Sequence, residues 1–333
     1  MPHEDLQPLA PISPRSLTPV NESTDGIVEQ FREACRAWVA KSPSLDTRSN
    51  YQCDLDQFMA FVDIPPEQPE QLASIRPRQV AEWRDHLHQL SLANSSIRRK
   101  LTVLRSLFAY LQSYGYTGAN PAHSDFVEAP PVPRDGKTVA LTAEDCRRLL
   151  DYPKADTPLG VRDQALLAVL AYTACRVGEL IRLKVGSYKT TSGHRILEIY
   201  GKGGKERRVP LHAEAVERLE RWLDVANIRE DLCGPLFRPL LTARGEGKCG
   251  FAMRPLTRRA VQYLVDRYVA KLRLDPNVTV HSFRVTALTT ARERGSDVID
   301  LQDFAGHSDP RTTLMYIRNR DRLAKSPAYI LRY

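Results

Sequence analysis

Hydrophobic residues recur every three to four positions through most of the chain, the spacing of amphipathic helices. In the N-terminal part this pattern predicts four helices, at residues 23–40, 45–62, 76–90 and 93–115. The first of them begins at a Ser-Thr-Asp start signal, which is typical of a helix N-terminus. No strand-like alternation occurs here, so residues 23–119 are expected to form a small all-helical domain.

A longer and more mixed region is expected at residues 138–333. The stretch "HRILEIYGKGGKERRVPL", residues 194–211, predicts two short strands around a glycine-rich turn. Helical spacing predicts the remaining elements at 141–153, 161–185, 212–226, 257–272, 281–295, 297–306 and 309–323. The sequence therefore predicts a mainly α fold with a small β-hairpin.

Two proline-rich stretches separate these regions from one another and from the N-terminus. Residues 1–22 contain five prolines and no hydrophobic period, so they are expected to be a disordered tail. Residues 120–137 contain four prolines and are expected to be a linker. The prediction is thus a tail, a helical domain, a linker and a mixed C-terminal domain.

Composition narrows the class of protein only mildly. The 48 lysines and arginines exceed the 40 acidic residues, and a net charge of +8 weakly favours a polyanionic partner. The six cysteines form no CxxC pair, which is typical of reduced, buried thiols in a cytosolic protein. No signal peptide or membrane-spanning run is recognisable, so a cytoplasmic protein without a membrane partner is expected.

Two arginines lie in settings that allow either chemistry or plain structure. His281 and Arg284 are three residues apart and project from one side of a helical turn, although a polar helix start explains them equally. Arg176 begins a short helix after a long apolar one, and Glu179 lies one turn further on. A surface ion pair is the plain interpretation, but the apolar flanks place this arginine near a core, where a charge needs a partner.

The glycine-rich turn carries Lys202 and Lys205 at its tip. It is no nucleotide-binding P-loop, because the GxxxxGK[ST] spacing and a following helix are both missing; the alternative is a solvated basic turn. The eight histidines show no metal-ligand spacing, and there is no GxSxG nucleophile motif. Neither a metal centre nor a serine hydrolase is expected.

The separate groups acquire a common chemistry when they are considered together. Arginine forks match the non-bridging oxygens of a phosphodiester, histidines donate to them or move protons, and a lysine on a turn reaches a leaving oxygen. A tyrosine supplies a nucleophile for a covalent phosphoryl intermediate. The candidate catalytic residues are Arg176, Lys202, His281, Arg284, His307 and Tyr316, with Glu179 in support of Arg176.

At these residues the chain resembles the tyrosine recombinases, the family of phage integrases and Xer-type enzymes, over roughly residues 24–325. The family pattern is matched in order by "TACRVGEL", "GKGGKERRVPL", "HSFR", "GHSDPRTT" and "LMYI", with the tyrosine nine residues beyond the histidine of the GH box. The resemblance implies a helical SAM-like core-binding domain and a mixed α+β catalytic domain that close as a C-shaped clamp on duplex DNA. It also implies cleavage and rejoining of strands through a 3′-phosphotyrosyl bond, with no cofactor or metal.

The family context gives the fourth helix a role in the major groove. Its first turns carry polar and basic side chains that suit DNA: Ser95, Ser96, Arg98, Arg99 and Lys100. A solvated basic face is the alternative. The resemblance further implies a homo-oligomer on its DNA site, a tetrameric synapse and a nucleoid-associated location. The apolar tail residues 328–331 suit docking into a neighbouring subunit, with packing in cis as the alternative.

One departure from the family concerns the residue two positions before Arg176. Many relatives have glycine there, whereas this chain has Ala174, which we expect to make the turn with a right-handed backbone. Two other functions use part of the same features. A type IB topoisomerase shares the chemistry but relaxes supercoils without sequence preference, and a catalytically silent DNA-binding regulator keeps only the fold. The presence of all six catalytic groups favours the recombinase.

Overall fold

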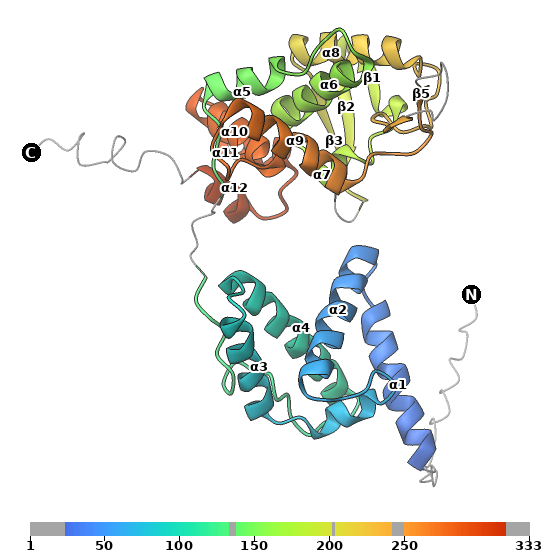
Figure 1. The fold of residues 1–333 in the computed structure, drawn as a ribbon, viewed down its shortest axis with the longest axis vertical. Helices are drawn as coiled ribbons and strands as arrows, with labels where there is room; N and C mark the ends of the chain where they lie inside the picture. The colour runs from blue at the N-terminus through green and yellow to red at the C-terminus, as the bar shows by residue number, and fades with distance from the viewer. Residues whose placement is uncertain (1–23, 133–137, 202–203, 242–249, 318–333) are drawn as a thin grey trace, which may run out of the picture. The chain divides into compact units, whose positions relative to one another are not determined.

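The computed structural model describes residues 24–132, 138–201, 204–241 and 250–317. The chain forms two compact units, Met1–Val132 and Pro133–Tyr333, each with its own hydrophobic core. Both consist mainly of helices, and small sheets occur only in the second unit among the described residues (Figure 1). The fold class predicted from the sequence is confirmed.

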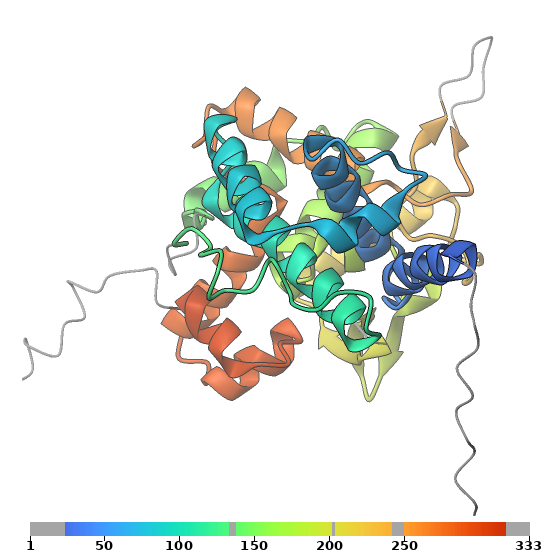
Figure 2. The same cartoon turned by 90° about the horizontal axis from the view of Figure 1, so that it is seen from below.

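The first unit is a bundle of helices (Figure 2). Its core is rich in aromatic residues. Trp38, Phe58, Trp83 and Phe108 are all buried in it, as the helical spacing predicts. The elements are α1 (Thr24–Ala40), α2 (Leu45–Phe61), the 3₁₀ helix η1 (Pro69–Ser74), α3 (Pro77–Gln89) and α4 (Asn94–Ser113).

The segment after α4 packs against this unit. Ala122 and Val127 are fully buried. The guanidinium of Arg105 on α4 donates to their carbonyl oxygens, at 2.8 and 2.7 Å, and Asn120 Nδ2 donates to the carbonyl of Arg105 at 2.9 Å. Part of the stretch predicted as a linker is thus held by backbone acceptors. Its last residues, 133–137, lie outside the described part of the chain.

The second unit combines helices with a three-stranded antiparallel sheet. The helix α6 is apolar on nearly every side and packs against α8 and α10, which makes it the centre of the core. The helices are α5 (Ala143–Asp151), α6 (Pro158–Thr173), α7 (Val177–Leu180), α8 (Ala213–Ala226), α9 (Arg258–Leu272), α10 (Val280–Glu293), α11 (Val298–Ala305) and α12 (Pro310–Ile317). The strands and the one short 3₁₀ helix described are β1 (Tyr188–Thr191), β2 (His194–Tyr200), β3 (Glu206–Pro210), β4 (Leu240–Leu241), β5 (Gly250–Phe251) and η2 (Val185–Ser187).

The predicted hairpin corresponds to β2 and β3. They pair antiparallel with Tyr200 opposite Glu206, and β1 adds a third strand on the other side of β2. The sequence did not predict β1, because its four residues "YKTT" carry one apolar side chain and so show no alternation. Residues 202–203 of the turn are outside the described residues.

The cysteines are less uniformly buried than expected. Cys35 and Cys175 are buried, but Cys53 and Cys233 are exposed, so the expectation of burial is wrong for these two. Cys53 lies on α2 beside the exposed Gln52, and Cys233 lies in a turn beside the exposed Leu232, so both are at surface positions. In a separate respect, none of the helices in the described part of the chain combines the length and apolar character needed to cross a membrane.

Candidate active site

The α6–α7 corner places the first arginine of the site. Helix α6 ends at Thr173, and the next residue, Ala174, has φ 49° and ψ 23°. The expectation of a right-handed Ala174 is therefore wrong. A left-handed residue ends the helix abruptly and lets the chain turn into α7, at a cost of roughly 1–2 kcal/mol for a residue with a Cβ. The buried Ala174 packs with Leu288 and Leu301, and burial of its methyl group offsets part of that cost.

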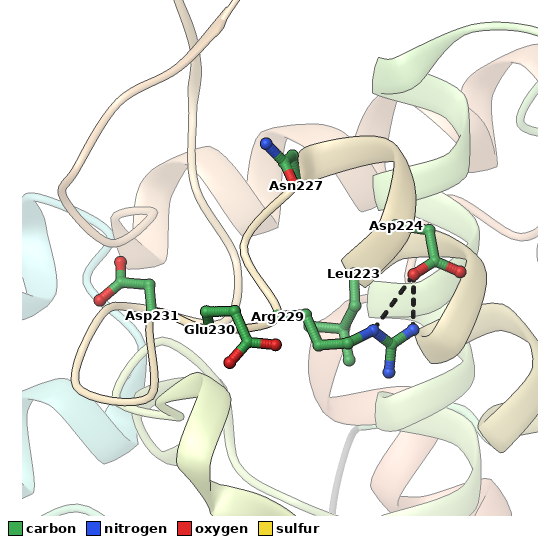
Figure 3. Close-up of a pocket in the computed structure, with 6 residues that line it drawn as sticks. All are labelled: Leu223, Asp224, Asn227, Arg229, Glu230 and Asp231. Atoms are coloured by element: carbon green, nitrogen blue, oxygen red, sulfur yellow. Dashed lines mark hydrogen bonds and ion pairs between the residues drawn. The ribbon is translucent and has the colours of Figure 1, made fainter.

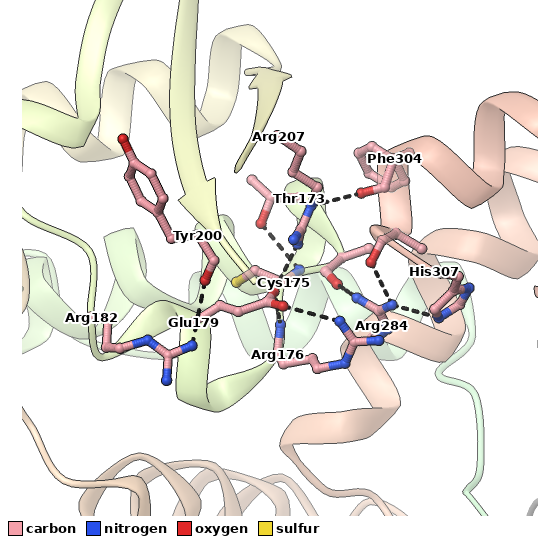
Figure 4. Close-up of polar contacts among 12 residues, drawn as sticks. Thr173, Cys175, Arg176, Glu179, Arg182, Tyr200, Arg207, Arg284, Phe304 and His307 are labelled. Carbon is pink, nitrogen blue, oxygen red and sulfur yellow. Dashed lines mark hydrogen bonds and ion pairs between the residues drawn. The ribbon is translucent and has the colours of Figure 1, made fainter. Parts of the chain in front are cut away.

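Arg176 precedes α7 and is fixed by Glu179 (Figure 4). The Glu179 carboxylate accepts from the Arg176 backbone N–H at 2.9 Å through Oε2 and from its Nη1 at 3.0 Å through Oε1. The Arg176 side chain is still 41% exposed, whereas that of Glu179 is 3% exposed. This pair leaves the remaining N–H groups of Arg176 at the surface, where a phosphate can reach them.

A second arginine reaches the same carboxylate from the sheet. Arg207 on β3 donates from Nη2 to Glu179 Oε2 at 2.8 Å and from Nε to the carbonyl of Phe304 at 3.1 Å. Burial raises the pKa of Glu179, but the hydrogen bonds from Arg207 and from the Arg176 backbone outweigh it, so the pKa is lowered overall. Glu179 is therefore an ionised group that joins α7 to β3, and through Arg207 to α11 (Figure 4).

Arg284 on α10 is 1% exposed and directs its guanidinium at the same region. Its Nη1 donates to the carbonyl of Ala174, and its Nη2 donates to the carbonyl of Ala305 at 2.7 Å. Nη2 also lies 2.6 Å from His307 Nε2 (Figure 4). A buried charge of this kind requires such partners, and here most of them are backbone oxygens that only this packing of α6, α10 and α11 supplies.

His307 follows the C-terminus of α11, where Gly306 adopts φ 62°. A Cβ at Gly306 would lie 3.0 Å from Arg207 Nη1. Glycine therefore suits this position for two reasons, because it adopts the positive φ without strain and leaves room for Arg207. The imidazole is buried; Nε2 faces Arg284 and Nδ1 lies 2.8 Å from Thr313 Oγ1. Burial, reinforced by Arg284 and Arg176, lowers the pKa of His307 to about 4, so the ring is neutral at pH 7.

The three remaining predicted catalytic residues are described to different extents. His281 lies in the first turn of α10 and is exposed, yet desolvation by the surrounding protein, with Arg284 and Arg176, lowers its pKa. Lys202 lies outside the described residues. Tyr316 belongs to α12, which packs against α10 and α11, but its side chain is not among those described. The structure thus brings Arg176, Arg284 and His307 together.

Two polar groups of this cluster were not singled out from the sequence, Arg207 and Thr313. Arg207 shares strand parity with the buried Val209, and this period of two was a signal for an inward-facing side chain. Thr313 is fully buried on α12, whereas the neighbouring Leu314 is only half-buried. A hydroxyl at a buried helical position gives no comparable signal in a sequence.

The five predicted DNA-binding residues lie in the first turns of α4 but differ in exposure. Ser95, Arg98 and Arg99 are exposed, and Ser96 is partly so. Lys100 is 6% exposed, and its Nζ lies 2.8 Å from Asp54 Oδ1 on α2. Arg99 forms an ion pair with the same carboxylate. Lys100 is thus a buried cation between two helices and not part of the exposed surface of α4.

A surface hollow of the second unit lies elsewhere, at the C-terminal end of α8. Its lining is Leu223, Asp224, Asn227, Arg229, Glu230 and Asp231, with Arg229 bound to Asp224 (Figure 3). None of these residues belongs to the cluster of Arg176, Arg284 and His307.

Known protein families and relatives match this sequence over nearly the whole chain. Residues 140–322 match the model of the phage integrase family, and residues 29–115 match its N-terminal SAM-like domain. The tyrosine recombinase XerD of Pseudomonas aeruginosa is 30% identical over 87% of this chain and 91% of its own length. XerD of Listeria monocytogenes is 29% identical over 84% of this chain and 89% of its own length.

Solved structures share the fold. The XerH site-specific recombinase bound to palindromic difH substrate, a post-cleavage complex, has a TM-score of 0.65 at 20% identity and covers 91% of this chain and 84% of its own. A lambda integrase dimer bound to a COC′ core site (residues 75–356) has a TM-score of 0.66 at 16% identity, over 88% and 96%. The chain belongs to the phage integrase family. It is a site-specific tyrosine recombinase, an enzyme that cleaves and rejoins DNA, and neither the topoisomerase nor the silent regulator is favoured.

Proposed function

We propose that Tyr316 is the nucleophile of this recombinase and that it attacks a DNA phosphodiester to form a 3′-phosphotyrosyl bond. The observation that supports this is the convergence of Arg176, Arg284 and His307, from three separate segments, beside the helix α12 that carries Tyr316. Two guanidiniums in one place stabilise the charge that develops on the non-bridging oxygens during attack.

The other groups complete the reaction. Lys202 protonates the departing 5′ oxygen, because an alkoxide is a poor leaving group. The exposed His281 contacts the scissile phosphate, and Glu179 holds Arg176 in position. The energy of the broken bond is kept in the covalent intermediate, so rejoining by the 5′ hydroxyl requires no ATP.

The proposed partner is duplex DNA carrying a recombination site. The exposed Ser95, Arg98 and Arg99, with Ser96, form its contact surface on α4, while Lys100 supports that helix from inside. The solved XerH and lambda relatives are bound to DNA sites, the lambda integrase as a dimer. We extend this to a homo-oligomer on DNA that forms a tetrameric synapse at the nucleoid. The tail residues 328–331, which lie outside the described residues, would join neighbouring subunits.

Replacement of Tyr316 by phenylalanine tests the nucleophile. Tyr316→Phe removes only the phenolic oxygen, so binding should be unchanged and the covalent protein–DNA adduct should be absent. The probe is a duplex selected by the protein from a randomised pool and nicked to trap the intermediate, and the readout is an SDS-resistant band. Tyr329 and Tyr333 are the other tyrosines of the tail. An adduct that persists in Tyr316→Phe would assign the role to one of them.

The general acid is tested by separating Lys202 from Lys205. A bridging 5′ sulfur leaves as a thiolate without a proton, so Lys202→Ala should be slow on ordinary DNA and largely restored on the sulfur substrate. Lys205 lies beside the turn, where its carbonyl accepts from the Gly201 N–H at 2.8 Å. Because that contact uses the backbone, Lys205→Ala should show neither the defect nor the rescue. Rescue of Lys205→Ala alone would contradict the assignment, and rescue of neither would move the role to His281.

A further inference from the structure

The buried hydroxyl of Thr313 faces the site from the helix that carries Tyr316. Thr313 lies on α12, three residues before Tyr316, and has no exposed surface. Its Oγ1 is 2.8 Å from Nδ1 of His307, which lies on the loop between α11 and α12. Helix α12 is fixed at its start by Pro310 and by Asp309, whose carboxylate accepts from the Arg311 N–H at 2.8 Å.

The contact on the other side of the imidazole determines which ring nitrogen carries the proton. His307 Nε2 lies 2.6 Å from Arg284 Nη2. Arginine has only donors, so Nε2 must accept this hydrogen bond and has to be unprotonated. A neutral imidazole then carries its proton on Nδ1, and that N–H donates to Thr313 Oγ1. Arg284 thus donates to His307, and His307 donates to Thr313, in a chain of hydrogen bonds that runs in one direction.

We infer that Thr313 is a positioning residue of the recombination reaction: its hydroxyl keeps His307 in the Nδ1–H tautomer that holds Arg284, and so couples α12 to the phosphate-binding arginine. The inference rests on the proposed roles of Arg284 and Tyr316. It adds a connection between them, because the element with the nucleophile and the element with the arginine share one hydrogen-bonded ring.

Thr313 matters because, through His307, it connects Arg284 to helix α12. The Arg284 guanidinium also donates to the carbonyls of Ala174 and Ala305, which lie at the ends of α6 and α11. The contact through His307 connects this guanidinium to the side chain of Thr313 on α12. Loss of the Thr313 acceptor removes a hydrogen bond that stabilises the Nδ1–H tautomer. The other tautomer, with the proton on Nε2, would direct a donor at the Arg284 donor.

The first measurement reads the tautomer without any catalysis. The ¹⁵N resonances of the ring, assigned with a His307→Gln variant of the full chain, distinguish a protonated from an unprotonated nitrogen. In the native protein Nδ1 should be protonated and Nε2 should not. In Thr313→Val, which keeps the shape and removes the hydroxyl, this preference should be lost. An unchanged Nδ1–H tautomer in Thr313→Val would overturn the inference, whatever the activity of the protein.

The second measurement is the rate of covalent adduct formation at saturating protein on the selected nicked duplex. Thr313→Val should slow it by about 10–100-fold, by analogy with the loss on removing the hydrogen-bond partner of a metal-ligating histidine. Thr313→Ser, which restores the hydroxyl, should return the rate to within a few-fold of native. Equal loss in Thr313→Ser would overturn the inference, because a hydroxyl would then not suffice.

Thr312→Val is the matched control. Thr312 precedes Thr313 on the same helix, is only partly buried and faces another direction, so its rate should stay near native. A defect as deep as that of Thr313→Val would show that the helix is disturbed and contradict the inference.

If Thr313→Val does not fold, Thr313→Ser and Thr313→Cys test the inference instead, through the same ring resonances and the same rate. Sulfur is a weaker acceptor than oxygen, so Thr313→Cys should be the slower of the two. Absence of an adduct in the native protein would refute the proposed function but leave the tautomer result standing.

Discussion

Arg176 and Arg284 of the candidate site are each held in a fixed direction by hydrogen bonds to a few polar groups. Arg176 is held by the carboxylate of Glu179, and Arg284 is held largely by the carbonyls of Ala174 and Ala305. Carbonyl acceptors cannot be removed by changing a side chain. The position of Arg284 therefore depends on the backbone of the α6–α7 corner, including the left-handed Ala174, and not on the chemistry of the residues that supply the oxygens.

The neutral imidazole of His307 makes stability depend on pH. Burial, with Arg284, lowers its pKa to about 4, whereas histidine in an unfolded chain titrates near ~6.5. Between these values the unfolded state binds the proton and the folded state does not. The stability that the folded protein gains from the neutral His307 ring is therefore complete above pH ~6.5 and is lost as the pH falls towards about 4. The loss amounts to at most about 3 kcal/mol of unfolding free energy. The exposed His281, whose pKa is also lowered, adds a smaller effect of the same sign.

Urea unfolding of the full chain at several pH values between about 7.5 and 4.5 measures this dependence. His307→Gln should be less stable at pH 7.5 but should lose most of the decline towards pH 4.5. His194→Gln, which alters an exposed histidine at the start of β2, is the control and should keep the native decline. A native slope in His307→Gln would contradict the assignment of the decline to this ring.

At the scale of elements, the carboxylate of Glu179 joins α7 to β3, and Arg207 extends the connection to the end of α11. Removal of one partner of a buried ion pair costs about 3–5 kcal/mol, and Arg207 is 11% exposed in its side chain. We expect Arg207→Ala to lose about 3 kcal/mol of unfolding free energy. Adduct formation should slow by about 10–100-fold, because Glu179 and the turn at Gly306 lose their common contact.

Arg208 provides the matched control for this prediction. It is the next residue of β3, it is 61% exposed, and its partners Glu198 and Glu206 are on the same sheet. Arg208→Ala should change stability by no more than about 0.5 kcal/mol and leave the adduct rate near native. Thermal unfolding and single-turnover cleavage of both variants decide the matter. Equal effects at the two positions would mean that loss of a positive charge, and not of the Glu179 contact, is responsible.

The elements also show why some predictions from the sequence succeeded and others failed. Helical spacing predicted the helices, and two short strand-like segments around a glycine-rich turn predicted the β2–β3 hairpin, because each of these patterns is local in the sequence. It did not predict the environment of Lys100, which lies on the apolar stripe of α4 with Ile97 and Leu101 and pairs with Asp54 of α2. A local pattern cannot reveal a partner that is 46 residues away, and the same holds for the contact between Arg207 and Glu179.

For the candidate site, motif order predicted Arg176, Arg284 and His307 in one place, and the structure places them together. Their supporting groups come from distant segments and carry no motif of their own. Ala174 shows a second limit of prediction from the sequence, which concerns backbone conformation. Its sequence permits a right-handed turn, but the structure has a left-handed residue there, and packing of its methyl group with Leu288 and Leu301 offsets part of the cost. Tertiary contacts thus decided a backbone conformation that local preference opposes.

At the scale of the whole molecule, an excess of basic residues should make DNA binding steeply dependent on salt. Each neutralised phosphate releases counterions, so log K falls against log salt with a slope of about −0.9 per contact. Arg98 is an exposed arginine of α4 whose guanidinium donates to the carbonyl of Pro130, from Nη2 at 2.9 Å and from Nε at 3.3 Å. Arg98→Ala should weaken binding and reduce the magnitude of the slope by about one contact.

Arg78→Ala removes the same charge from the same unit and separates a contact from a general charge effect. Arg78 lies on α3, and its side chain is 87% exposed and paired with Glu82. Affinity of the full chain for the selected duplex and for an unrelated duplex, at three salt concentrations, gives both slopes. Arg78→Ala should leave the slope unchanged.

If Arg98 also contacts base edges, Arg98→Ala should lose more affinity on the selected duplex than on the unrelated one. An equal loss of affinity on both duplexes would mean that Arg98 contacts phosphate only. Identical slopes for the two variants would contradict a contact surface on the first turns of α4, because only the total charge would then matter.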